Sequence, residues 1–328
     1  RNIIAFFAFV SFFPQLVAGP IERAANLLPQ FYTTKKFNYD QAVDGMRQIL
    51  WGLFKKIVIA DNCAAYVNDI FANYNVYSGS TLLLGATLFA FQIYCDFSGY
   101  SDIAIGTARI LGFNLKRNFS FPYFSRDIAE FWRRWHISLT SWFRDYVYIP
   151  LGGSQGGTWS KIRNTFIIFI ISGFWHGANW TFIAWGFLNA MLFLPLILRN
   201  QNRKYINTVA EGRFLPNLRE IFQIVSTFFI TSIAWIFFRA ESISEAIYYI
   251  KGIFSTSFFS TPEIFPKTLI LFIFMLLTIE WIQRNKQHAL QIETNILPKT
   301  IRWGYYYSII WSILYFDGKQ NEFIYFQF

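Results

Sequence analysis

The stretch TFIIFIISGFWHGANWTFIAWGFLNAMLFLPLIL (Thr165–Leu198) decides the fold class of this chain. It belongs to a run of 35 residues, between Arg163 and Arg199, that contains no Asp, Glu, Lys or Arg. As one straight helix the run would be about 52 Å long at 1.5 Å per residue, whereas the hydrocarbon core of a bilayer is roughly 30 Å thick. We therefore expect it to break or bend, either within Gly173–Gly177 or at Pro195, whose ring disrupts the preceding turn.

The composition of the whole chain also indicates a membrane protein. Of the 328 residues, 54% are hydrophobic and only 15% are charged, compared with about 25% charged residues in a typical soluble domain. Several other apolar runs reach the length of a membrane span. The sequence therefore predicts an all-α, polytopic integral membrane protein, with short re-entrant and interfacial helices. The two cysteines, Cys63 and Cys95, form neither a disulfide framework nor a metal site.

The basic residues predict the orientation in the membrane. The net charge of +10 comes from short loops between apolar runs, which argues for cytoplasmic loops and against nucleic-acid binding. Residues 199–219, for example, carry five basic residues and one acidic residue. If this loop is cytoplasmic, the runs Ile221–Phe238, Thr268–Gln283 and Trp303–Phe316 cross in turn and place the C-terminus on the outer side.

The beginning of the chain predicts its domain organisation. The sequence opens at Arg1 in an already apolar segment, so we expect the C-terminal portion of a longer polypeptide. Residues 2–21 are uncharged but contain two prolines and a glycine, a pattern typical of a short or re-entrant helix. Gln41–Asp61 mixes apolar and basic residues and predicts an interfacial or partly buried helix. We expect one membrane-embedded domain over residues 1–328.

Two acidic residues follow the uncharged run Ile70–Cys95. This run leads directly into Asp96 and Asp102, so the sequence predicts two carboxylates at the end of an apolar helix. Asp102 and Arg109 are seven residues apart, which would place them on one helix face where they can pair.

The segment Ser125–Tyr148, SRDIAEFWRRWHISLTSWFRDYVY, is rich in both charge and tryptophan. As one helix it would present a shared face of Trp132, Arg133, His136, Thr140 and Phe143. Such a helix is unsuited to lipid along its whole length, so we expect it to lie against a water-filled cavity or at an interface. The glycine-rich loop that follows it resembles a phosphate cradle in composition only.

The chain has three histidines. His288 lies in a charged loop and is predicted to be solvated. His176 and His136 lie in apolar surroundings, where they are either ordinary core residues or, as ionisable groups at membrane depth, parts of a functional site. Imidazole suits proton transfer near neutral pH. No third ligand stands at metal-binding spacing, so we predict no metal site.

Four motifs identify the chain as a member of a known family. Asp127–Gly153, Ser172–Gly186, Tyr94–Gly106 and Phe12–Arg23 resemble, in the same order, motifs of the membrane-bound O-acyltransferase family. The most similar branch is the one that O-acetylates alginate, peptidoglycan and other bacterial polysaccharides. The resemblance implies a helical bundle around a central tunnel, located in the bacterial cytoplasmic membrane.

The resemblance also implies the residues that carry out the reaction. His176 would be the essential active-site histidine and His136 the second polar residue of the tunnel. The co-substrate would be an acyl thioester, either acetyl-CoA or an acyl carrier protein, with no bound cofactor. Residues expected to line the tunnel or to supply donors for the developing oxyanion are Trp132, Arg133, Thr140, Trp175, Asn179, Asp96 and Asp102.

The aromatic tail FIYFQF gives a further expectation. In this branch such a tail reaches into the outer funnel, so the resemblance implies that Tyr325 accepts the acyl group. A partner resembling SGNH hydrolases, on the outer side, would then pass it to the polysaccharide. A plain interfacial anchor is the alternative role of the tail.

Three other functions remain open at this point. The first is a transporter or flippase with a histidine-lined path, which would predict symmetry between the halves of the chain. The second is a lipid-directed acyltransferase. The third is a catalytically inactive structural subunit.

Overall fold

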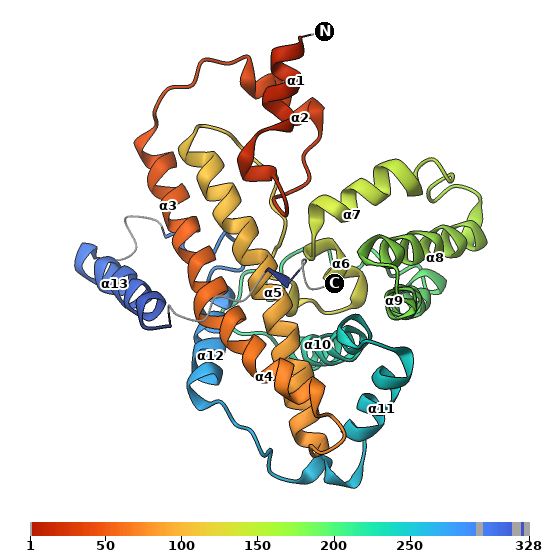
Figure 1. The fold of residues 1–328 in the computed structure, drawn as a ribbon. Helices are drawn as coiled ribbons and strands as arrows, with labels where there is room; N and C mark the ends of the chain where they lie inside the picture. The colour runs from red at the N-terminus through yellow and green to blue at the C-terminus, as the bar shows by residue number, and fades with distance from the viewer. Residues whose placement is uncertain (1, 293–297, 317–322, 325–328) are drawn as a thin grey trace.

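The computed structural model describes residues 2–292, 298–316 and 323–324, and every regular element in these ranges is helical (Figure 1). In chain order the α-helices are α1 (Ile3–Val10), α2 (Ala24–Phe31), α3 (Tyr39–Leu53), α4 (Asp61–Ala72), α5 (Gly79–Ile110), α6 (Ile128–Arg134), α7 (Ile137–Phe143), α8 (Gly157–His176), α9 (Trp180–Leu198), α10 (Leu218–Arg239), α11 (Ile243–Ile253), α12 (Lys267–Ile282) and α13 (Lys299–Phe316). Short 3₁₀ or π-helical segments cover Phe13–Gln15, Phe54–Ala60, Pro122–Phe124, Arg144–Tyr148 and Thr256–Phe259. The predicted all-α class is confirmed.

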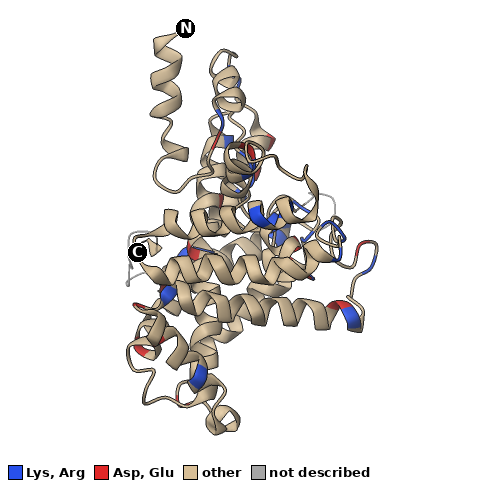
Figure 2. Ribbon diagram, turned by 90° about the vertical axis from the view of Figure 1, so that its right-hand side faces the viewer, with Lys and Arg blue, Asp and Glu red and all other residues tan. Residues whose placement is uncertain are grey.

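Within the described ranges, three helices are long and apolar enough to cross a membrane: α5, α9 and α10. α5 is largely covered by the rest of the protein, whereas α9 and α10 expose much of their apolar surface. Figure 2 shows long stretches of uncharged helix, with Lys, Arg, Asp and Glu gathered mainly near helix ends and loops. This distribution fits helices that are embedded in lipid and end in water.

The centre of the fold is the packing of α5 against the helical run that contains α3 and α4 (Figure 1). Glycines permit the close approach. A Cβ atom on Gly52 would lie 2.6 Å from the carbonyl oxygen of Gly99, and one on Gly45 would lie 2.6 Å from that of Gly106. Small residues at such positions bring two backbones together in membrane helices, where packing rather than burial from water drives association.

The prediction that Asp96 and Asp102 end an apolar helix is wrong, because α5 continues past both to Ile110. The predicted pairing of Asp102 with Arg109 is also wrong. Asp102 instead pairs with Lys55 at 2.6 Å, and Arg109 pairs with Asp44. Both new partners come from the α3 run, so tertiary packing against α5 offers nearer opposite charges than the same helix does.

The single helix predicted over Ser125–Tyr148 is also wrong, because the chain breaks between α6 and α7. Trp135 is extended, and His136 has a left-handed backbone with φ of +41°. Two backbone hydrogen bonds to the preceding loop hold this break: Ser120 N–H donates to Arg134 O at 2.9 Å and Ile137 N–H donates to Asn118 O at 2.8 Å.

The predicted break in Thr165–Leu198 is confirmed, and it follows directly on His176. α8 ends at that residue, and Asn179 caps α9 by accepting a hydrogen bond from Thr181 N–H at 3.1 Å. Pro195, the other predicted break point, lies inside α9. The two helices form the hairpin at the right of Figure 1.

Glycines also determine how closely the two arms of this hairpin pack. A Cβ atom on Gly173 would lie 2.3 Å from Phe182 O, and one on Gly186 would lie 2.3 Å from Phe169 O. Gly173 therefore serves close helix packing.

His288 is not the solvated side chain that the sequence predicts. It is only 2% exposed, and its Nε2 atom lies 2.9 Å from Asp44 Oδ1. Burial raises the pKa of Asp44, but the hydrogen bond from His288 and the charges of His288, Arg109 and Arg47 together hold it below its ordinary value. The segment that follows α12 thus packs onto α3 instead of remaining in water.

Candidate active site

A cavity of about 720 Å³ lies among the helices α6 to α10, and both His136 and His176 line it. Its walls also include side chains of α5, among them Phe97. The volume is in the range of ordinary small-molecule sites, and most of the lining is apolar or aromatic with a few polar groups. The predicted tunnel residues can therefore be placed relative to one real cavity.

One face of α8 forms a wall of this cavity. Its lining residues follow helical spacing: Lys161, Thr165, Ile168, Phe169, Ser172 and His176. From Lys161 to His176 the helix rises about 22 Å at 1.5 Å per residue. The wall thus leads from an ammonium group at one end to an imidazole at the other.

Besides Lys161, the cavity is lined by other positively charged side chains. Arg133, Arg144 and Arg203 line the same cavity. Arg133 donates to Asn202 O at 2.7 Å and to Tyr205 O at 2.8 Å, so it also fixes the loop that follows α9. Four cationic side chains around one cavity favour an anionic ligand.

His176 lies in an aromatic surround at the last position of α8. Its ring centroid is 4.9 Å from that of Trp175, 5.4 Å from that of Trp185 and 4.9 Å from that of Phe238. The helix ends there because Gly177 and the cap of α9 redirect the chain. This position puts a titratable ring at the end of a helix wall, among aromatic rings.

His136 is almost fully buried and strained. It is 4% exposed, and its left-handed backbone is uncommon for a residue other than glycine. Its Nδ1 atom lies 2.9 Å from Asn118 Oδ1, and its ring makes an edge contact with Phe97 at 4.6 Å between centroids. Strained residues held by their surroundings cluster at functional sites.

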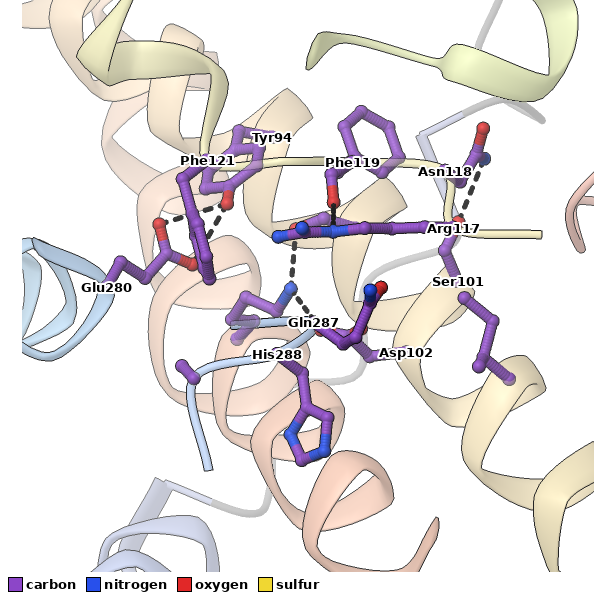
Figure 3. A pocket seen from close by; sticks show the side chains of 14 residues that line it. Tyr94, Ser101, Asp102, Arg117, Asn118, Phe119, Phe121, Glu280, Gln287 and His288 are labelled. Carbon is purple, nitrogen blue, oxygen red and sulfur yellow. Dashed lines mark hydrogen bonds and ion pairs between the residues drawn. The ribbon is translucent and has the colours of Figure 1, made fainter. Parts of the chain in front are cut away.

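A second, much smaller cavity of about 10 Å³ is lined by Asn118 and Phe119 of the loop between α5 and α6 (Figure 3). Most of its lining residues are polar, and they include the Lys55–Asp102 ion pair. Tyr94 also lines it and donates to Glu280 at 2.9 Å. The space is about the size of one water molecule, so this region is a packed polar core and not a substrate site.

The predicted site residues divide into two groups. Trp132, Arg133 and Thr140 line the large cavity together with both histidines. Trp132 Nε1–H donates to Asn189 Oδ1 at 3.2 Å, which ties α6 to α9. The predicted single helix is therefore divided into α6 and α7, but the residues of its predicted shared face still line one cavity.

The remaining four predicted residues do not line this cavity. Trp175 is half exposed, and Asn179 donates its side-chain amide to Glu241 O at 3.0 Å besides capping α9. Asp96 pairs with Lys56 at 2.8 Å. Asp102 lines the small cavity of about 10 Å³. In this structure Asn179, Asp96 and Asp102 make contacts that stabilise the fold.

Several lining residues were not predicted from the sequence. Lys161, Ser172 and Trp235 line the large cavity. The α8 members could have been found by counting back from His176 in steps of three and four. Trp235 lies on α10, far along the chain, and Asn118 precedes His136 by 18 residues in an irregular loop. Neither gives a local signal.

Tyr325, the third predicted catalytic residue, lies outside the described residues. Phe323 and Ile324, directly before it, are described and contact α5. Ile324 N–H donates to Asp96 Oδ2 at 2.7 Å, and the Phe323 ring lies 6.1 Å from that of Phe97, centroid to centroid. Over the described ranges, no three His, Cys, Asp or Glu side chains are grouped as metal ligands.

The sequence is similar to proteins of known families. The model of the "MBOAT, membrane-bound O-acyltransferase family" matches residues 1–239. The chain is 40% identical over 264 residues to the probable alginate O-acetylase AlgI of Pseudomonas aeruginosa, covering 80% of this chain and 48% of that protein. It is 39% identical over 246 residues to the peptidoglycan O-acetyltransferase of Helicobacter pylori, covering 74% and 45% respectively.

A more distant relative is the teichoic acid D-alanyltransferase of Bacillus subtilis, 31% identical over 234 residues, which cover 67% of this chain and 57% of that protein. The chain thus spans about half the length of the curated relatives it matches. The family model covers well over half of the chain. This chain therefore belongs to the membrane-bound O-acyltransferase family.

Proposed function

We propose that this protein transfers an acyl group, acetyl by preference, from a thioester to hydroxyl groups of a polysaccharide at the bacterial cytoplasmic membrane. One observation carries the proposal: His136, at the break between α6 and α7, and His176, the last residue of α8, line the same cavity. A reaction that must remove a proton from a hydroxyl and later supply one to a leaving sulfur needs such groups together.

The cations of the cavity support an anionic donor. Coenzyme A and the pantetheine arm of a carrier protein both carry phosphate at the end remote from the thioester. Lys161 and the arginines that line the cavity suit that phosphate, and the wall of α8 then gives about 22 Å of path to His176. The basic residues of the loop 199–219 support a cytoplasmic position for this end.

The acceptor class rests on the relatives. The three relatives are named for acyl transfer to alginate, peptidoglycan and teichoic acid. The common chemistry is acyl transfer to a polymer, so a polysaccharide hydroxyl is the acceptor we propose here. In the reaction the hydroxyl oxygen bonds to the acyl carbon, the carbon–sulfur bond breaks, and the hydroxyl proton passes through imidazole to the thiolate.

The polysaccharide ester content of cells tests the proposal. Cells that express the full-length protein with His176→Ala should lose the ester that wild-type cells carry. Phe174→Ala is the matched control, because Phe174 lies on the same helix, is 69% exposed and does not line the cavity. Equal ester content in His176→Ala and wild-type cells would refute the catalytic role, and ester on lipid instead of glycan would refute the acceptor.

We propose further that Tyr325 relays the acyl group to an outer partner resembling SGNH hydrolases. The support is local: Phe323 contacts Phe97, and Phe97 in turn contacts His136. The described part of the tail thus lies one aromatic ring away from the candidate site. Tyr325→Phe should abolish polymer ester while leaving hydrolysis of the thioester donor intact. Unchanged ester content would instead indicate an interfacial anchor.

A further inference from the structure

The strongest unexplained feature is the loop residue that holds His136. Asn118 is fully buried and belongs to neither helix α6 nor α7. Its backbone carbonyl accepts from Ile137 N–H at 2.8 Å, and its side-chain Oδ1 receives Ser138 N–H at 3.3 Å and Ser138 Oγ–H at 2.9 Å. These bonds bracket the left-handed His136 on its C-terminal side. Asn118 thereby holds a backbone conformation that is otherwise disfavoured.

The orientation of the Asn118 amide follows from its neighbours. Backbone N–H of Ser138 can only donate, so the amide atom facing it must be the oxygen. The amide nitrogen then points the other way and donates to Ser101 Oγ at 3.0 Å. Ser101 lines the small polar cavity of Figure 3, where Asn118 and Ser101 are joined by a dashed line.

The tautomer of His136 follows in turn. An amide oxygen has no proton to give, so His136 Nδ1, which lies 2.9 Å from it, must carry the proton. In the neutral ring Nε2 is then the unprotonated atom. We infer that Asn118 is a positioning residue that fixes His136 as the Nδ1–H tautomer, so that Nε2 is the atom that accepts the proton of the attacking hydroxyl.

This inference rests on the proposed acyl transfer and assigns the direction of one proton step. As the hydroxyl oxygen bonds to the acyl carbon, its proton moves to His136 Nε2, and it leaves from the same atom when the thiolate departs. The Asn118 amide accepts a hydrogen bond from Nδ1–H but is too weak a base to take that proton, so Asn118 does not relay protons. Nε2 therefore both takes up the hydroxyl proton and releases it. In the neutral ring Nε2 has no proton to donate, so His136 first acts as a base toward the hydroxyl and can act as an acid only afterwards.

The first test reads the tautomer directly. Full-length protein labelled with ¹⁵N-histidine, reconstituted in bilayers at a pH where the ring is neutral, is compared with His136→Gln protein to identify the His136 signals. The expected spectrum shows a protonated Nδ1 and an unprotonated Nε2. Asn118→Ala should give a mixture of both tautomers. A protonated Nε2 in the wild type would overturn the inference, whether or not the protein is an acyltransferase.

The second test uses the pH profile of acyl transfer. Asn118→Asp places a carboxylate against Nδ1–H and should move the acidic limb of the profile to higher pH, by about one unit or more. Other titratable or charged groups that line the large cavity with His136 are His176, Arg133, Arg144, Tyr148, Lys161 and Arg203, and those near Asn118 in the small cavity are Lys55, Tyr94, Asp102, Arg117, Glu280 and His288. All of them remain in the variant.

Ser101→Ala is the matched control for this second test. It removes only the hydrogen bond on the far side of the Asn118 amide, so the limb should stay where it is in the wild type. A folded, active Asn118→Asp protein with an unshifted limb would refute the positioning role. If the Asn118→Asp protein is inactive, its ¹⁵N spectrum is used in place of the pH profile. The spectrum must still show a protonated Nδ1 on His136.

Discussion

Replacing Gly173 with alanine should force apart the two arms of the α8–α9 hairpin beside His176. The new Cβ atom would lie 2.3 Å from Phe182 O, whereas ordinary contact begins near 3.4 Å. The helices must therefore separate by about 1 Å at this point. Overpacking of this kind costs about 1–3 kcal/mol. Because His176 lies one turn further along α8, a shift of about 1 Å there can lower the rate of transfer by roughly 100-fold.

Two measurements check this prediction: the thermal unfolding midpoint in detergent and the rate of acyl transfer in membranes. Gly304→Ala provides the control, because Gly304 lies inside α13 and its added Cβ would meet nothing within 4 Å. That variant should be neutral or gain about 0.5–1 kcal/mol of stability through helix propensity. A Gly173→Ala protein with the midpoint and rate of the wild type would refute the packing argument.

Three other variants test separate parts of the structure. Lys161→Glu should raise the KM for the thioester donor about tenfold or more, with a weaker effect at high salt, because it reverses a charge in the cavity. Asp96→Ala should lower polymer ester content, because it removes the acceptor of the Ile324 N–H bond. Hydrogen bonds from Thr81 and Ser78 hold the pKa of Glu263 at about 2, below its ordinary value of 4.5. Wild-type stability should therefore decline as the pH falls from about 4.5 to 2, and Glu263→Gln should flatten that decline in thermal melts.

Each of these variants has a matched control on an exposed residue. Lys251→Glu, on α11 and outside the cavity lining, should leave the donor KM unchanged. Asp40→Ala should leave ester content unchanged, and Glu211→Gln should keep the pH dependence of the wild type. Equal effects in a variant and its control would show that net charge, and not the named contact, is responsible.

Asp96 and Asp102 show why local sequence rules failed for the ionic contacts. The seven-residue spacing of Asp102 and Arg109 predicts a pair on one helix, yet Asp102 pairs with Lys55 of the neighbouring π-helical segment. Asp96 pairs with Lys56 of the same segment, and both distances are under 3 Å. His288 is a second example: it lies in a charged loop in the sequence but is buried against Asp44 in the structure. Partners that are 40 or more residues distant carry no periodic signal, so only packing could reveal them.

The sequence by itself determined the class and the break beside His176. Apolar runs too long for one span must turn, and Gly177 with the Asn179 cap supplies a local reason for the turn. Its motifs also named both histidines. These features are local, because hydrophobic length, capping and glycine act within a few residues of themselves.

Only the tertiary structure decided how those residues meet. It broke the predicted helix at His136, gave that residue a left-handed backbone and set its ring against Asn118. It also placed one face of α8 and both histidines around a single cavity. The physical reason is that hydrogen bonds from the loop before α6 outweigh the helix propensity of a short polar segment. Their partners lie 14 or more residues apart, so no local pattern contains both.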